Sequence, residues 1–263
     1  MWNGNYMNFV YSNSFRGFSH IKSNKPCQDY SDYLITKDRT IITCCDGHGG
    51  EVYYRSDIGS KLASDAIKYV LFNLKEKHLN DLNKVKLDVL CKWNELVENH
   101  IIENPIREED LDFLSKEQVY RLINNPVVAY GTTLNAVMYF KDKILCLQLG
   151  DGGIYKIHTG VASEVFISDD DDVCNLTYSL CSDNAFEHLK IKLLDNDNVS
   201  IFIYTDGVSS PYQDLENFKN SFIIPVFNKI KNGEDKEFLN DFLLDLSTKI
   251  GTGDDVSFGC IVS

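Results

Sequence analysis

Apolar residues follow two different spacings along this 263-residue chain, one typical of strands and one typical of helices. Runs rich in β-branched and aromatic residues, several of them alternating with polar residues, are typical of strands. We predict strands at 40–45, 132–140, 143–149, 153–158, 199–205 and 256–262. Apolar residues at helical spacing predict helices at 52–76, 87–102, 115–123 and 236–249.

These elements are grouped in the sequence and do not alternate strictly. A pair of strands opens the chain, a helical block follows, and then come several strands, a helix and a last strand. This order favours an antiparallel α+β layered fold over a doubly wound parallel sheet. We expect one domain over residues 1–263. Residues 161–198 are the least regular part, and their run Asp169–Asp172 favours a solvated loop over a cation site.

Composition and charge narrow the function classes. Hydrophobic residues make up 43% of the chain and charged residues 25%, which is typical of a globular protein. The net charge of −13 disfavours binding to nucleic acid. No apolar run is long enough to cross a bilayer, and the first residues do not resemble an export signal. The eight cysteines contain no Cys-x-x-Cys pair, so we expect a reduced, cytoplasmic protein.

Four aspartates lie at ends of the predicted strands: Asp46, Asp151, Asp206 and Asp254. An Asp-Gly pair between two strands is also a hairpin signal, and for Asp151 a plain turn is an open alternative. Asp46 and Asp206 are not followed by a partner strand, so the turn explains them less well. Carboxylates fixed at strand ends can converge on one point, where they would repel unless a cation neutralised them. Hard ions such as Mg²⁺ and Mn²⁺ prefer such oxygen ligands.

The surrounding motifs resemble those of the metal-dependent Ser/Thr protein phosphatases of type 2C, in particular compact bacterial members. The resemblance covers nearly the whole chain, from about Arg16 to Val262. Its motifs, in the family's order, are Asp46-Gly47-His48-Gly49-Gly50, Gly131-Thr132-Thr133, Gly150-Asp151, Thr205-Asp206-Gly207-Val208 and Asp254-Asp255-Val256-Ser257. Upstream, Cys27-Gln28-Asp29 occupies the place of the family's N-terminal acidic element.

The resemblance implies a four-layer α-β-β-α sandwich with a binuclear Mg²⁺ or Mn²⁺ centre at one end. By this similarity, Asp46 would bridge both ions and the carbonyl of Gly47 would bind one of them. Asp206 and Asp254 would complete the shell of the other ion. Asp29 would orient metal-bound water from the second shell. Asp151 would belong to an additional, weaker metal position.

The implied reaction is hydrolysis of phosphoserine or phosphothreonine esters in a phosphoprotein, in opposition to a Ser/Thr kinase, by a protein expected to be a monomer. Two ions would generate hydroxide near neutral pH and neutralise the phosphoryl oxygens. The leaving alkoxide needs a proton, for which His48 is the best-placed general acid. A purely structural role for His48 within its glycine loop is the alternative.

Several positions depart from the family's pattern. Gln28 stands where the family usually has Glu, which should weaken one metal position. The family's phosphate-binding arginine has no clear counterpart, because the spacing of Arg16 is wrong, and this leaves phosphate recognition to the metals, His20 or Lys22. Residues between Asp151 and Asp206 carry no landmarks of the family's flap. A catalytically silent binding protein and a phosphohydrolase acting on small esters therefore stay open as alternatives.

Overall fold

The computed structural model describes residues 9–167 and 177–263, and in them ten strands form two antiparallel five-stranded sheets. The first sheet has the order β1 (Phe9–Phe15), β10 (Val256–Val262), β9 (Ser200–Tyr204), β6 (Gly153–His158) and β7 (Val161–Glu164). The second has the order β2 (Tyr30–Ile35), β3 (Arg39–Cys45), β4 (Leu134–Phe140), β5 (Lys143–Leu149) and β8 (Lys190–Asp195).

The two sheets pack face to face. Because successive side chains of a strand point to opposite faces of its sheet, each central strand contributes to two apolar layers. In β3, Ile42 and Cys44 face residues of the other sheet such as Ile203, within one apolar cluster. Ile41 and Cys45 point the opposite way and join a second cluster with the helices. Because both faces of the central strands are buried, these strands are nearly continuous hydrophobic runs.

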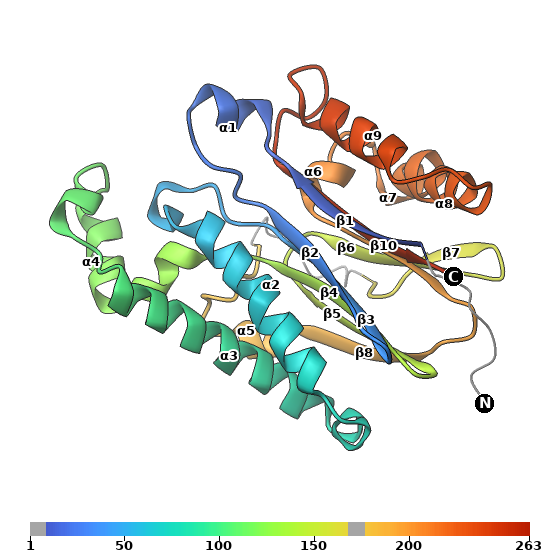
Figure 1. The fold of residues 1–263 in the computed structure, drawn as a ribbon. Helices are drawn as coiled ribbons and strands as arrows, with labels where there is room; N and C mark the ends of the chain where they lie inside the picture. Colours follow the sequence, from blue (N-terminus) through green and yellow to red (C-terminus); the bar gives the residue numbers. More distant parts are fainter. Residues whose placement is uncertain (1–8, 168–176) are drawn as a thin grey trace.

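Helices cover the outer face of each sheet (Figure 1). The second sheet is covered by α2 (Ser56–Asn73) and α3 (Leu82–Glu103), and the first by α7 (Leu215–Phe218), α8 (Ile224–Lys231) and α9 (Glu237–Ser247). The remaining helices are α1 (Phe18–Lys22), α4 (Lys116–Asn124), α5 (Ala185–His188) and α6 (Asp206–Ser209). The predicted four-layer α-β-β-α sandwich is confirmed.

Residues 161–198, predicted to be the least regular part, hold only short elements where the structure describes them. This stretch contains β7, α5 and β8, and β8 pairs with β5 at the edge of the second sheet. Only one side of β8 is hydrogen-bonded and its side chains are at most half-buried, so its hydrophobic signal is weak. The run Asp169–Asp172 lies outside the described residues.

The topology brings one end of several strands together. In the first sheet, Tyr204 at the end of β9 pairs with Gly153 at the start of β6 and with Phe258 near the start of β10. In the second, Tyr30 at the start of β2 pairs with Cys45 at the end of β3. The segments just beyond these residues therefore lie at a common end of the sandwich.

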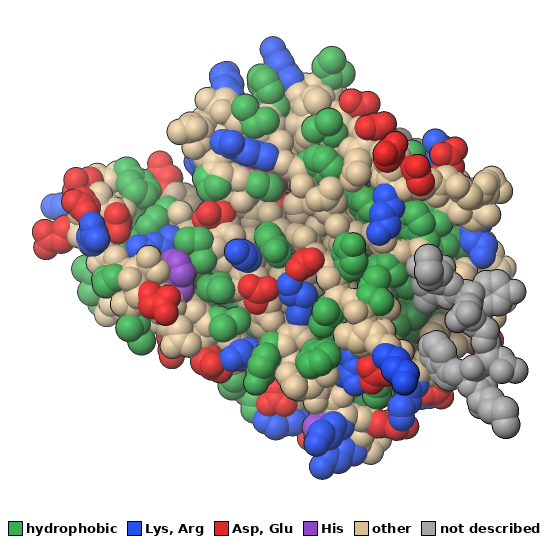
Figure 2. Space-filling view, in the orientation of Figure 1, with side chains coloured by type: hydrophobic (Ala, Val, Ile, Leu, Met, Phe, Trp, Pro, Cys, Tyr) green, Lys and Arg blue, Asp and Glu red, His purple; other side chains and the backbone are tan. Residues whose placement is uncertain are grey.

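Charged groups of both signs are interspersed on the face of the molecule that Figure 2 shows. Within the part of the chain that the structure describes, no helix combines the length and apolarity that crossing a membrane requires.

Candidate metal centre

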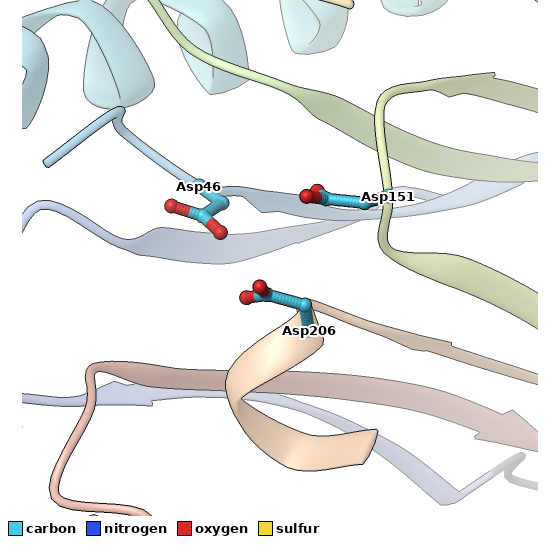
Figure 3. A group of neighbouring side chains, drawn as sticks. All are labelled: Asp46, Asp151 and Asp206. Atoms are coloured by element: carbon cyan, nitrogen blue, oxygen red, sulfur yellow. The ribbon is translucent and has the colours of Figure 1, made fainter. Parts of the chain in front are cut away.

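Three of the predicted aspartates converge at this end of the sandwich. Asp46 follows β3, Asp151 lies in the turn between β5 and β6, and Asp206 begins α6 directly after β9. Their side chains point toward one another (Figure 3), and one carboxylate oxygen of each lies within 4.8 Å of the others. A single divalent ion can bind oxygens at this separation after small side-chain movements.

The three carboxylates open into a cavity of about 210 Å³. Its lining residues are His20, Gln28, Asp29, Asp46, Gly47, His48, Gly49, Asp151, Asp206, Asp254 and Asp255. Every site residue predicted from the sequence is therefore at this cavity. Asp254 is exposed at its edge and is not part of the close group of three.

The Gly131-Thr132-Thr133 motif holds the backbone of Asp46. The carbonyl of Asp46 accepts hydrogen bonds from Thr132 Oγ1 and from the Thr133 backbone N–H, both at 2.8 Å. The Asp46 N–H in turn donates to Thr133 Oγ1 at 3.0 Å. These bonds fix the backbone of Asp46 at the end of β3, next to the cavity that its side chain lines.

Gly47 is required by close backbone packing. A Cβ at this position would lie 2.6 Å from the carbonyl oxygen of Gln28 and 2.7 Å from that of Ser56. The N–H of Gly47 donates to the same Gln28 carbonyl at 3.1 Å. The glycine thus lets the chain after Asp46 pass between two other segments while it lines the cavity.

Asp29 lines the cavity and is 5% exposed. Its Oδ2 accepts a hydrogen bond from Thr205 Oγ1 at 2.8 Å. Burial, the dominant cause, raises the pKa of Asp29 to about 8, with the negative charges of Asp255 and Asp206 adding to the effect.

Burial and mutual repulsion disfavour charge on the converging carboxylates as well. Burial raises the pKa of Asp46 well above its usual range, and the charges of Asp29, Asp206 and Asp151 raise it further. Burial, and then the charge of Asp151, also raises the pKa of Asp206. A divalent cation would reverse this balance by neutralising the carboxylates.

An unpartnered polar atom supports the fit of a cation or its water. Gln28 donates from Nε2 to the backbone carbonyl of His48 at 3.0 Å and to Ser56 Oγ, whereas its buried Oε1 has no partner among the described residues. The three converging side chains, those of Asp46, Asp151 and Asp206, offer only carboxylate oxygens. Such a set suits Mg²⁺ or Mn²⁺ and not a thiolate-preferring metal.

His48 lies at the cavity with its backbone and ring both engaged. Its N–H donates to the Gly131 carbonyl at 3.0 Å, and its ring packs edge-on against Tyr53 with centroids 4.8 Å apart. Burial lowers the pKa of His48 below its usual value. Both alternatives considered for this residue, structural and catalytic, are compatible with this placement.

Asp255 is the site residue that sequence reasoning left without a role. It is 4% exposed, and its Oδ2 lies 2.8 Å from His20 Nδ1. The sequence feature that could have pointed to a role for Asp255 is its place directly after Asp254 and before a strand of buried residues. A charged side chain at the start of such a strand needs a partner, which the sequence alone did not identify.

Three solved structures share this fold. The catalytic domain of the serine/threonine protein phosphatase PstP, solved with two manganese ions, has a TM-score of 0.64 at 15% identity, with 97% of this chain and 99% of that chain covered. A Streptococcus agalactiae serine/threonine phosphatase has a TM-score of 0.62 at 14% identity, with 97% and 99% covered. PppA of Pseudomonas aeruginosa, described as a regulatory component of a type VI secretion system, has a TM-score of 0.61 at 16% identity, with 97% of each chain covered.

The fold is thus that of the bacterial serine/threonine phosphatases. The family model described as protein phosphatase 2C matches residues 16–244, and the chain belongs to this family. No curated protein has a significant sequence match to it.

Proposed function

We propose that this protein hydrolyses phosphoserine and phosphothreonine esters in a phosphoprotein with the help of two Mg²⁺ or Mn²⁺ ions. The observation that carries the proposal is the convergence of Asp46, Asp151 and Asp206 from separate parts of the chain into one cavity. Family membership and the two manganese ions of the PstP structure support it. The substrate would be the product of a Ser/Thr kinase.

The residues at the cavity would share the work of holding the ions. Asp46, whose backbone is held by Thr132 and Thr133, would hold the ions together with Asp206, Asp254 and the carbonyl of Gly47. Asp151 would serve an additional ion. When bound, the ions would make water nucleophilic near neutral pH and neutralise the phosphoryl oxygens.

Two other groups would act on protons and water. Asp29, fixed by Thr205, would accept a hydrogen bond from the attacking water and so orient it. His48 would donate a proton to the leaving serine or threonine oxygen. Its buried environment favours the neutral ring, so the proton would be held by only part of the molecules at neutral pH.

The test is hydrolysis of a phosphothreonine peptide and of p-nitrophenyl phosphate by the purified protein. We expect activity with added Mn²⁺ and its loss with EDTA. Activity that persists in EDTA would exclude the metal mechanism, whereas no hydrolysis of either substrate would favour a silent binding protein. Hydrolysis of p-nitrophenyl phosphate alone would point to small phosphate esters.

A further inference from the structure

The cavity has few groups that could bind a phosphate dianion. Six of its lining residues are aspartates, and its only basic side chains within the described residues are His20 and His48. Even with two divalent ions bound, a formal negative charge would remain on the carboxylates. A substrate phosphate in this cavity therefore needs a hydrogen-bond donor from the protein, and this reasoning rests on the proposed function.

The ring of His20 is held in one orientation by Asp255. His20 Nδ1 lies 2.8 Å from Asp255 Oδ2. The same carboxylate accepts the backbone N–H of Gly17 on Oδ1 and that of Gln28 on Oδ2, each at 2.6 Å. Three donors thus hold a buried carboxylate still, and it in turn fixes the imidazole so that Nδ1 carries the shared proton.

The other ring nitrogen of His20 is free to meet a ligand. Nε2 makes no hydrogen bond to the described residues, and the side chain is 14% exposed while it lines the cavity. The hydrogen bond to Asp255 also raises the pKa of His20, which favours a ring protonated on both nitrogens. A protonated Nε2 is a charge-assisted donor for a phosphoryl oxygen.

The short helix α1 keeps His20 at the cavity. The backbone N–H and the Oγ of Ser19 both donate to the Gly253 carbonyl, at 2.9 and 2.7 Å. Arg16 Nη2 donates to the His20 carbonyl at 3.1 Å, so this arginine supports the helix and does not line the cavity. Lys22 does not line it either.

We propose that His20 is a substrate-binding residue whose Nε2–H donates to the phosphoryl group, and that Asp255 is the residue that positions it. The structure thus separates His20 from the other cations of this segment. Arg16, Lys22 and Lys25 do not line the cavity, and Lys25 Nζ donates to the Gly49 carbonyl at 3.3 Å. The Asp255 carboxylate positions the ring of His20 and also holds the backbone of Gly17 and Gln28.

The first test compares His20→Ala with wild type on a phosphothreonine peptide at saturating Mn²⁺. A lost hydrogen bond to a charged group costs about 1.5–3 kcal/mol, which corresponds to a rise of roughly tenfold or more in KM and in the inhibition constant of inorganic phosphate. Calorimetry should show the same loss for inorganic phosphate binding, with an unchanged affinity for Mn²⁺. His20→Arg should recover part of the phosphate affinity, and His158→Ala, far along β6 from the cavity, should match wild type.

The positioning role of Asp255 has its own readout. In the wild-type protein with Mg²⁺, inorganic phosphate should shift the NMR signal of His20 Nε2, an observation that needs no variant. Asp255→Asn should change the tautomer balance of His20 and weaken phosphate binding in the same direction as His20→Ala.

The outcomes separate this inference from the proposed function. A wild-type protein without metal-dependent hydrolysis would remove the proposed function itself. An active wild type whose His20→Ala variant keeps its phosphate affinity, or whose His20 Nε2 signal does not respond to phosphate, would overturn the inference. A His20→Ala variant that loses Mn²⁺ affinity in proportion would reassign His20 to support of the Asp254 loop, which also overturns it.

Discussion

The carboxylates of Asp46 and Asp206 approach each other within 4.8 Å, although Asp46 follows a strand of one sheet and Asp206 follows a strand of the other. Their meeting point exists only when the two sheets are packed together. Because the unfolded chain has no such site, ion binding would stabilise the assembled sandwich. The same two residues repel each other when no cation is present.

The first prediction concerns the Asp206 carboxylate. Asp206→Asn should lower Mn²⁺-dependent turnover by about a hundredfold or more, because it removes a charged ligand from the cavity. The metal-free variant should melt at a higher temperature than metal-free wild type, since one of the repelling charges is gone. Steady-state kinetics and thermal melts in EDTA measure the two effects.

Asp241→Asn is the matched control. It makes the same chemical change at an exposed residue of α9 that does not line the cavity. It should leave both turnover and melting temperature unchanged. Wild-type turnover in Asp206→Asn would remove Asp206 from the ligand set.

The second prediction concerns pH. Burial raises the pKa of Asp29 to about 8, and the pKa values of Asp46 and Asp206 are raised as well, so the metal-free cavity retains protons at mildly acidic pH. A cation must displace these protons, and its affinity therefore rises as pH increases toward 8. The increase in melting temperature caused by Mn²⁺ should be larger at pH 8 than at pH 5.5.

Unfolded aspartates titrate near their ordinary values, so between about pH 4 and pH 8 the folded metal-free cavity binds more protons than the unfolded chain. This difference makes the cavity's own contribution to stability fall as pH rises, and Mn²⁺ should cancel the fall. In Asp206→Asn the pH dependence of the Mn²⁺ effect should be shallower. A Mn²⁺ effect that is constant from pH 5.5 to 8 would contradict the prediction.

The convergence of Asp46 and Asp206 can be predicted from the sequence because strand ends are local features. Asp46 and Asp206 each follow a run of buried residues directly, and in this antiparallel topology the ends concerned come together. The pairing of His20 with Asp255 could not be predicted in the same way. It joins two ends of the chain through the docking of α1 on the 253–255 loop, which no local pattern encodes.

The helices over the first sheet show a second limit. Phe218, Phe222, Val226 and Ile230 are buried at helical spacing, yet no helix was predicted there. Pro225, which cannot donate a backbone hydrogen bond, lies at the second position of α8, and a π-helical turn at Lys219–Ile223 precedes it. Because proline is typical of helix ends, the sequence pattern alone does not predict that the helical segment continues through Pro225.

The third prediction concerns His48 and the leaving group. His48→Ala should slow hydrolysis of a phosphothreonine peptide at least about tenfold more than that of p-nitrophenyl phosphate, whose leaving group departs without a proton. In the wild type, the ratio of peptide to p-nitrophenyl phosphate turnover should fall as pH rises, because the proton on His48 is lost below the usual pKa of histidine. Rates on both substrates from pH 5 to 8 provide the measurement.

His158→Ala is again a suitable control, since His158 lies at the far end of β6. Equal losses on the two substrates in His48→Ala would favour the structural role, in which the ring only packs on Tyr53.

The last prediction concerns the contact that brings Asp206 to the Asp254 loop. A Cβ on Gly207 would lie 2.0 Å from the backbone carbonyl oxygen of Asp255, so α6 can approach this loop only with glycine there. Gly207→Ala should force the two segments apart, at a cost of about 1–3 kcal/mol in unfolding free energy. It should also weaken Mn²⁺ affinity, because Asp206 and Asp254 move together with these segments.

Ser210→Ala, an exposed change at the end of the same helix, should stay within about 0.5 kcal/mol of wild type. Denaturant unfolding and calorimetric Mn²⁺ titration test both effects, and a destabilised Gly207→Ala protein with undiminished Mn²⁺ affinity would show that this contact supports the fold without shaping the metal centre.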